Sequence, residues 1–284
     1  MSFIVVLAAI VPSHSSLLIF PELDYDGPTR TGVGAILSNP AGLWGVGEEL
    51  MVAGGFWFTD SRLTLAGLRA GSWGFRLSYL DYGSLEFQDE TPDDEGGPSF
   101  RPYAFEASVM RAFLPEKETK LGIGFGYIRQ GIYDGGYTAY HFSVGVLHTP
   151  ERLRGLSVAA GIRNLGLDRI TDLAEERIPT QFYAGLSYER GPARFGAEWA
   201  RVPSYDTSGS YLSLTPTGTE LRFKMDWTIR EVLTPSVAYS YGREIDPLEF
   251  RVSFVSGKLG FSYGFRPSFL GFDALHLLSL RYKP

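Results

Sequence analysis

One stretch of the chain, residues 219–227, alternates strictly between large apolar and charged side chains. Leu221 and Phe223 fall on one side of an extended strand, and Arg222 and Lys224 fall on the other, because successive side chains of a strand point to opposite faces. A strand that is buried on both faces cannot carry this pattern. Two arrangements can: a soluble sandwich with its charges in water, or a closed barrel with lipid outside and a polar lumen inside.

Repetition of the pattern decides between these arrangements. Two-faced alternation recurs about fourteen times between residue 49 and the C-terminus. So many apolar faces exceed what one small core can absorb, whereas lipid around a barrel can cover all of them. The sequence therefore predicts an all-β fold, a transmembrane antiparallel up-and-down β-barrel with the even strand number that is typical of bacterial single-chain barrels.

The connections between the expected strands give an independent check on their number. After odd-numbered strands come the longer connections, among them 88–100, 165–179 and 203–216, although the first connection is short. After even-numbered strands come short turns, such as 71–72 and 191–192. Outer-membrane barrels have short periplasmic turns and longer outer loops, and a wrong strand count would scramble this alternation.

Composition excludes several other classes of protein. Aromatic residues at 14% and 34 glycines suit many strands and tight turns. The absence of cysteine leaves no disulfide framework and no thiolate metal site. The net charge of −6 gives no reason to expect a nucleic-acid partner. We expect no cofactor.

The chain before the first strand divides into two parts. Residues 1–16 hold an apolar run of signal-peptide length followed by small polar residues, although no basic residue precedes Arg30; the alternatives are a first strand or a slightly misassigned start. No other apolar run approaches the length of a transmembrane helix. Residues 17–48 show turn chemistry instead of alternation, and the barrel is expected at 49–284.

Two motifs in that second part carry a family resemblance. Residues 30–35 (Arg-Thr-Gly-Val-Gly-Ala) and the hatch residues Asn39, Pro40, Ala41, Gly42 and Leu43 resemble the N-terminal signature of the long-chain fatty-acid transporter (FadL-like) superfamily of outer-membrane barrels. Within it the likeness is closer to the PorV/PorQ branch, which is associated in some bacteria with type IX secretion. Weaker likenesses lie at 164–166, 178–180, 185–188, His276 and 279–280. The chain departs from the pattern in a short linker after Ala35 and in its ending Tyr282-Lys283-Pro284.

The resemblance implies a bacterial outer-membrane location and a hatch in the lumen, and the residues agree with a plug. Val33, Ile36 and Leu37 need a dry environment, which a barrel lumen supplies. Glycines without side chains would let the plug backbone approach the wall closely. The expected lumen-lining residues are Glu106, Gly122, Gly124, Gly126, Glu198, Glu220, Arg222, Lys224 and Asp226. Their charged members form either a mutually neutralising network or a substrate path.

Two other sets of residues suggest chemistry only weakly. His141 and Ser143 share an inward face, as in an outer-membrane lipid-modifying enzyme, but no acidic or amide partner can be assigned to them. The acidic cluster within 89–95 could bind calcium, yet the neighbouring Gly96-Gly97-Pro98 marks a solvated loop. We therefore expect no catalytic residue and no metal site.

Three functional classes remain open. The first is a non-enzymatic barrel that transports or holds a hydrophobic small molecule or a partner peptide, with outer-membrane lipid around it. The second is a secretion accessory of the PorV kind that hands secreted or periplasmic proteins to a surface complex. The third is an outer-membrane enzyme. The placement of residues 17–48 bears most directly on the choice.

Overall fold

The computed structural model of the chain describes residues 27–56, 61–86, 99–132, 135–169, 180–202, 218–241, 247–267 and 274–284. The expected signal peptide at 1–16, the start of the expected plug at 17–26 and the acidic cluster within 89–95 lie outside these residues. Among the residues described, no helix is long and apolar enough to cross a membrane.

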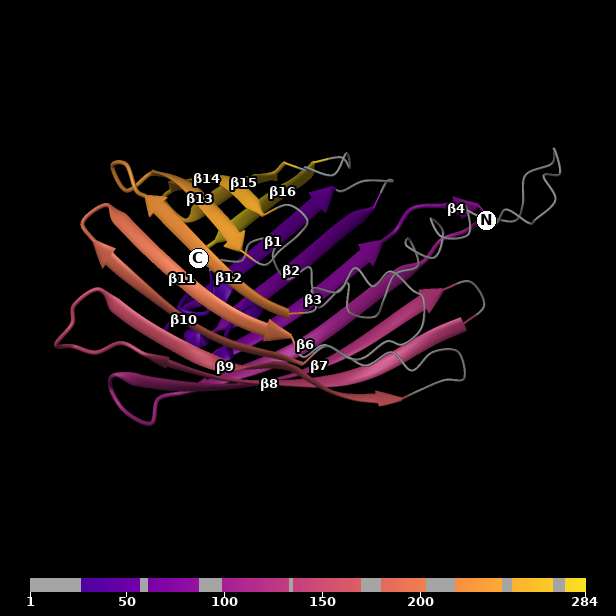
Figure 1. Ribbon diagram of the computed structural model, residues 1–284, viewed down its shortest axis with the longest axis horizontal. Coiled ribbons are helices and arrows are strands. Elements are labelled where there is room, and N and C mark those ends of the chain that lie inside the picture. The colour runs from indigo at the N-terminus through magenta and orange to yellow at the C-terminus, as the bar shows by residue number, and fades with distance from the viewer. Residues whose placement is uncertain are drawn as a thin grey trace.

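Fourteen strands form one closed barrel in which every neighbouring pair is antiparallel and β1 pairs with β16 (Figure 1). They are β1 (Glu48–Phe56), β2 (Arg62–Ala70), β3 (Trp73–Asp81), β6 (Tyr103–Phe113), β7 (Thr119–Ile132), β8 (Gly135–His148), β9 (Leu156–Arg169), β10 (Gln181–Arg190), β11 (Ala193–Val202), β12 (Gly218–Trp227), β13 (Leu233–Tyr241), β14 (Leu248–Ser256), β15 (Leu259–Arg266) and β16 (Leu275–Tyr282). The prediction of a fourteen-strand antiparallel barrel is confirmed, and the soluble sandwich is wrong.

The two faces of each strand differ as the alternation requires. On β12, Phe223 is 52% exposed on the outside of the barrel, whereas its neighbour Arg222 is only 7% exposed on the inside. The same outward exposure of large apolar side chains recurs on the other barrel strands, and buried polar side chains alternate with them. An apolar outer surface around a polar interior is the arrangement that lipid favours.

Strand lengths depart from the sequence-based expectation on one side of the barrel. β7, β8 and β9 each have 14 residues, so β9 continues to Arg169 where the sequence suggested a loop from residue 165. The pairing of β8 with β9 shifts between Phe142 and Val144, and Asn164 takes a positive φ of 59°. This β-bulge lets the strand continue past the position where alternation breaks.

A small additional sheet lies outside the barrel pairing. β4 (Leu85–Glu86) pairs with β5 (Ser99–Phe100) at the two ends of the first long connection. The connection between β3 and β6 thus begins and ends as a short antiparallel ladder.

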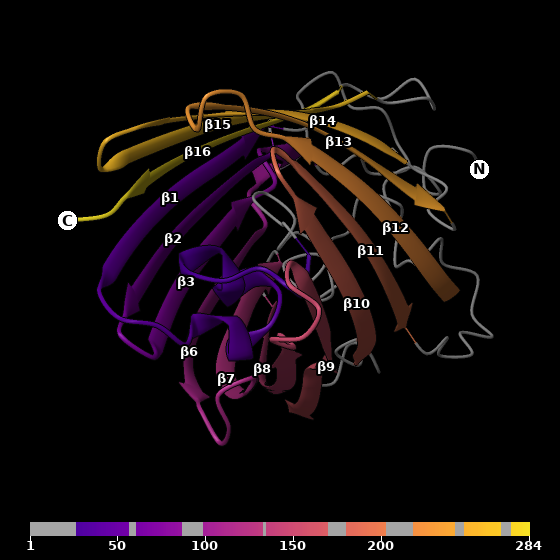
Figure 2. The same ribbon diagram turned by 90° about the vertical axis from the view of Figure 1, so that its left-hand side faces the viewer.

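The short turns, the start of β1 and the end of β16 share one end of the barrel, which we call the turn end. Viewed from that end, residues 33–43 lie inside the barrel next to β2, β3 and β6 to β8 (Figure 2). The N-terminal segment therefore occupies the lumen on one side.

Candidate functional site: the plug and the charged lumen

The plug, defined here as residues 27–47, is built from two short 3-10 helices. They are η2 (Val33–Leu37) and η3 (Pro40–Leu43), and every residue of both is buried. Asn39 caps η3, because its Oδ1 accepts a hydrogen bond from the Ala41 amide at 3.1 Å. Pro40 follows at the first helical position, where the absence of an N–H does no harm. The segment thus folds into compact turns instead of one long helix.

Glycines of the wall make room for the plug, but only one of the expected three does so. A Cβ at Gly122 would overlap the backbone of Pro40 and Ala41. Gly124 faces Met110 and Ser143 instead, and Gly126 faces the His141 ring.

Four further wall glycines face the plug and were not expected to do so from the sequence: Gly67, Gly74, Gly145 and Gly185. A Cβ at Gly67 would overlap Ile36, and one at Gly74 would lie 2.7 Å from Leu43. The sequence places these glycines on the inward face of their strands, but it does not show which plug residue lies opposite each of them.

Polar groups of the wall hold the plug at several points. Asn39 Nδ2 donates to the carbonyl of Val146 on β8 at 3.1 Å and to the carbonyl of Pro28 at 3.0 Å. Glu49 Oε2 accepts from the Val33 amide at 2.7 Å. These contacts satisfy buried polar groups that would otherwise cost free energy.

Two arginines of the wall complete this set of contacts. Arg76 Nη1 donates to the Ile36 carbonyl at 3.3 Å, and Arg163 Nη1 donates to the Leu37 carbonyl at 3.4 Å. These bonds satisfy two successive carbonyls at the end of η2, because the last carbonyls of a helix have no amide donor within the helix. Neither arginine was among the expected site residues, although both alternate with apolar residues and therefore face inward.

Apolar contacts add to these hydrogen bonds on one half of the wall. One buried cluster combines plug and wall residues: Val33, Ala35, Ile36, Leu37 and Leu43 with Met51, Ala53, Leu63, Leu65, Leu80, Ala104, Met110, Ala112, Ile128, Ala139, Leu275 and Leu277. The wall members come from β1, β2, β3, β6, β7, β8 and β16. The plug is therefore bound to that half of the lumen.

The expected charged lumen residues face inward, and several of them take part in ion pairs. Glu106 pairs with Arg76 and lies 3.1 Å from His141 Nε2. Glu198 pairs with Arg163 at 3.4 Å. Lys224 and Asp226 pair with each other at 3.1 Å, and Glu220 lies half-buried on the same strand. Two of these partners, Arg76 and Arg163, come from strands that the sequence analysis did not connect to them.

Arg222 belongs to a second cluster that was not expected. Its Nη2 lies 2.8 Å from Glu249, which also contacts Arg251 and Arg266, both at 2.7 Å. All four side chains are buried. A carboxylate that accepts from three guanidinium groups is held by charge-assisted hydrogen bonds.

The arrangement around His141 does not resemble a nucleophile with its base. His141 Nε2 faces Glu106, not Ser143, and the cavities described below do not reach either residue. In the described part of the chain, no group of three His, Cys, Asp or Glu residues could hold a metal ion.

Two cavities lie beside the plug at the turn end. One of about 730 Å³ is bounded by Arg30–Gly32, Trp44–Val46 and the β8–β9 turn. The other, of about 290 Å³, is bounded by Arg30 and Arg194 and by inward residues of β12 to β16.

An ion pair joins two of the short turns at the turn end. Lys117 pairs with Glu151, and this hydrogen bond raises the pKa of Lys117.

Comparison with known proteins shows likeness in structure only. No protein-family model and no curated protein sequence matches the chain. The toluene transporter TodX of Pseudomonas putida is similar in structure over 97% of this chain and 96% of its own, with a TM-score of 0.61 at 12% identity. The monoaromatic hydrocarbon channel CymD covers 89% of this chain and 93% of its own, with a TM-score of 0.59 at 11% identity.

A FadL homologue of Pseudomonas aeruginosa also resembles this chain. It has a TM-score of 0.52 at 10% identity and covers 89% of this chain and 94% of its own. These neighbours are transporters and channels, not enzymes. At such low identity the comparison shows that the chain has the fourteen-strand barrel fold of the FadL-like hydrocarbon channels.

Proposed function

We propose that this protein is a non-enzymatic barrel of a bacterial outer membrane that transports or holds a small hydrophobic molecule, with the plug as its hatch. The apolar outer surface supports the membrane location, since water would not stabilise so much exposed apolar area on a monomer. In a closed barrel the backbone N–H and C=O groups of every barrel strand can pair with a neighbouring strand, as a lipid environment requires.

The observation that carries the proposal is the attachment of the plug to one apolar half of the wall. The cluster of Met51, Leu65 and Met110 with the plug is the apolar environment that a hydrophobic solute would also prefer. A plug held by a few hydrogen bonds and side-chain contacts, without strand pairing to the wall, can shift without breaking the barrel.

The names of the structural neighbours support the same class of substrate. TodX is described as a toluene transporter and CymD as a monoaromatic hydrocarbon channel. We infer a small hydrophobic solute for this chain also, because the lumen next to the plug is lined by Leu, Ile, Met and Ala side chains.

The hatch role can be tested at Gly122. In Gly122→Ala, the new methyl group would overlap the backbone of Pro40 and Ala41, so the plug must leave its place on β7. We expect faster uptake of toluene or a hydrophobic fluorescent probe into proteoliposomes than with the unaltered protein. Trypsin cleavage after Arg30 would report that the plug has been displaced.

Gly124→Ala is the matched control on the same strand and face. Its methyl group would lie 3.1 Å from the flexible Met110 side chain and would not touch the plug. Uptake should stay unchanged. Unchanged uptake in Gly122→Ala, with Arg30 newly cleaved, would show that the plug is not a hatch.

A second candidate is a PorV/PorQ-like secretion accessory, and one observation favours it. Val46 is 94% exposed and Trp44 is 37% exposed where the plug leaves the lumen at the turn end. Exposed apolar residues at this end could bind a periplasmic or secreted protein. A photo-crosslinker placed at Val46 should then capture a discrete periplasmic protein in cells; capture of lipid alone would exclude this role.

A further inference from the structure

The two helices of the plug leave a polar passage along the half of the lumen that they do not contact. They touch β1, β2, β3 and β6 to β8. The two larger cavities share Arg30, Glu189 and Arg194, so they adjoin each other at the turn end. From there the polar lining continues inward past Lys224 and Asp226. This passage is separate from the apolar cluster to which we assign hydrophobic solutes.

The lining of the passage favours anions. Five hydroxyl side chains, those of Thr228, Thr234, Ser236, Ser253 and Ser262, line the smaller of the two cavities. Seven cationic side chains border the two cavities together: Arg30, Arg69, Arg154, Arg194, Lys224, Arg281 and Lys283. Four anionic ones do so: Glu49, Glu151, Glu189 and Asp226. The described lining therefore has an excess of three positive charges.

The carboxylates of the passage are all engaged by cations. Glu49 contacts Arg69 and Lys283 at 3.1 and 3.3 Å, and Glu189 lies 3.3 Å from Arg194. Asp226 pairs with Lys224, and Glu151 pairs with Lys117. A mobile cation would have to compete with these fixed partners, whereas hydroxyl and guanidinium donors can solvate a small anion.

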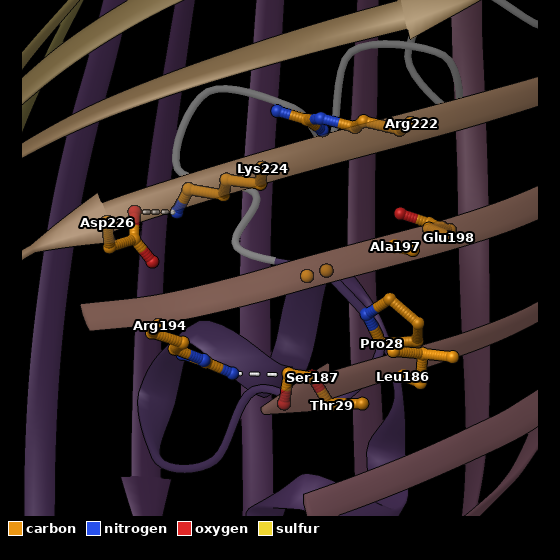
Figure 3. Close-up of a pocket in the computed structure, with 12 residues that line it drawn as sticks. Pro28, Thr29, Leu186, Ser187, Arg194, Ala197, Glu198, Arg222, Lys224 and Asp226 are labelled. Carbon is orange, nitrogen blue, oxygen red and sulfur yellow. Dashed lines mark hydrogen bonds and ion pairs between the residues drawn. The ribbon is translucent and has the colours of Figure 1, made fainter. Parts of the chain in front are cut away.

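A constriction lies at the inner end of the passage. Here Gly27, Pro28 and Thr29 approach β10 and β11 and leave only about 20 Å³, which is room for roughly one water molecule. Figure 3 shows Pro28 and Thr29 between Leu186, Ser187 and Ala197, with Arg194 bonded to Thr29. That bond joins Arg194 Nη2 to Thr29 Oγ1 at 3.3 Å. Glu198 and Arg222 also line this small cavity.

We propose that the passage between the plug and β10 to β16 admits small inorganic anions such as chloride from the turn end, and that Pro28 and Thr29 form the constriction that limits their flow. The hydrophobic solute and the anion then use opposite halves of one lumen. The proposal does not require the plug to leave its place on β7.

The passage is tested by ion conductance across planar bilayers under a KCl gradient. Pro28→Gly removes the ring that closes the constriction but keeps the carbonyl that accepts from Asn39. We expect a severalfold rise in conductance and a reversal potential shifted toward the chloride equilibrium potential. A shift toward the potassium potential, or an unchanged conductance in the inserted variant, would overturn the proposal.

A second substitution should reverse that rise. Gly260 borders the smaller cavity, and a Cβ there would have no heavy atom nearer than 3.7 Å, so we expect the ring of Gly260→Phe to enter that cavity. Combined with Pro28→Gly, it should return the conductance to the original level. Gly54→Phe, on the outer face of β1 with equally open space, is the matched control and should leave the rise intact.

Thiol labelling tests access independently of conduction. The chain has no cysteine, so Ser253→Cys would introduce a single thiol into the smaller cavity. A sulfonate-bearing methanethiosulfonate should react faster there than its ammonium counterpart, and Val252→Cys, on the outer face, should react with neither. Faster reaction of the ammonium reagent at residue 253, or no reaction with either, would contradict an anion passage.

Discussion

At the scale of single residues, each strand assigns its side chains to lipid or to the lumen by position alone. Phe223 and Arg222 are neighbours in sequence, yet one is half-exposed on the outer surface and the other is buried against Glu249. Because the side-chain period of a strand is two, a register shift by one residue would exchange these environments. The register is therefore fixed by the chemistry of both faces.

Substitutions at these two neighbours should have unequal costs. Phe223→Arg would place a guanidinium on the lipid face, and we expect a loss of about 2–4 kcal/mol in unfolding free energy if the site is near the bilayer midplane. Arg222→Leu should cost less, because Glu249 keeps Arg251 and Arg266. Urea unfolding of the protein in lipid vesicles, followed by tryptophan fluorescence, measures both.

The reverse order would contradict the assignment of faces. If Phe223→Arg were harmless and Arg222→Leu were destructive, the apolar outer surface would not meet lipid. Thr219→Arg offers a control at the edge of the same strand, where the depth dependence predicts a cost near 0–1 kcal/mol.

At the scale of elements, the plug depends on one capping residue. Asn39 is fully buried and makes three hydrogen bonds: one to the Ala41 amide, one to Pro28 and one to Val146 of the wall. Asn39→Ala removes all three, whereas Asn39→Asp keeps the acceptor for Ala41 and loses the two donors. The two variants therefore separate the cap from the attachment to the wall.

Hydrogen exchange of the plug amides should reveal the effect of both substitutions. Loss of a helix cap costs about 0.5–2 kcal/mol, so the amides of residues 41–43 should exchange faster in Asn39→Ala than in the unaltered protein. Asn39→Asp should speed exchange as well, because it leaves a buried charge next to two carbonyls. Slower or unchanged exchange in both variants would mean that Asn39 does not hold the plug.

Alternation predicted the strands and their faces well, but not where the strands end. It identified fourteen strands and the inward side of residues such as Glu106 and Lys224. It missed the six-residue continuation of β9 beyond Arg163, because the bulge at Asn164 interrupts the period of two without ending the strand. Where a strand ends depends on its pairing with the neighbouring strand, and the alternation of side chains does not reveal that pairing.

The partners of the lumen residues were harder to predict than their direction. Arg76 and Glu106 belong to paired strands, β3 and β6, but which cation meets which carboxylate depends on register. Arg163 on β9 pairs with Glu198 on β11, and β10 lies between these two strands. The sequence does not show that two side chains on strands that are not neighbours come this close. The site residues could be assigned to the lumen from sequence, whereas their ion pairs required the three-dimensional arrangement.

At the scale of the whole molecule, the lumen has two unlike halves. Most of its apolar inward residues lie on β16, β1 to β3 and β6 to β8, where the plug is attached. The cluster around Glu249, the Lys224–Asp226 pair and the cavity of about 290 Å³ lie toward β11 to β16. The cavity of about 730 Å³ lies between the plug, β1, β2 and the β8–β9 turn. A plug that filled the lumen evenly would bury both halves. The observed asymmetry instead sets the plug helices against the half that holds most of the apolar inward residues.

The orientation of the barrel in the membrane follows from its two ends. The plug and the short turns share the turn end, and the connections 87–98, 170–179 and 203–217 join strands at the opposite end. Because outer-membrane barrels carry their longer loops outside, we expect these connections to face the exterior of the cell. In intact cells trypsin should cut after Arg177, and a glutamate-specific protease should cut after Glu90 or Glu95 in the first of them.

Basic residues in the turns serve as the internal control for that experiment. Arg152, Arg230 and Lys258 lie in or beside the short turns, so trypsin should reach them only after the outer membrane has been permeabilised. Cleavage at Arg230 and Lys258 in intact cells, with Arg177 protected, would show that the barrel has the opposite orientation in the membrane. It would also place the plug and the anion passage on the outer side, where the exposed Val46 could not meet a periplasmic partner.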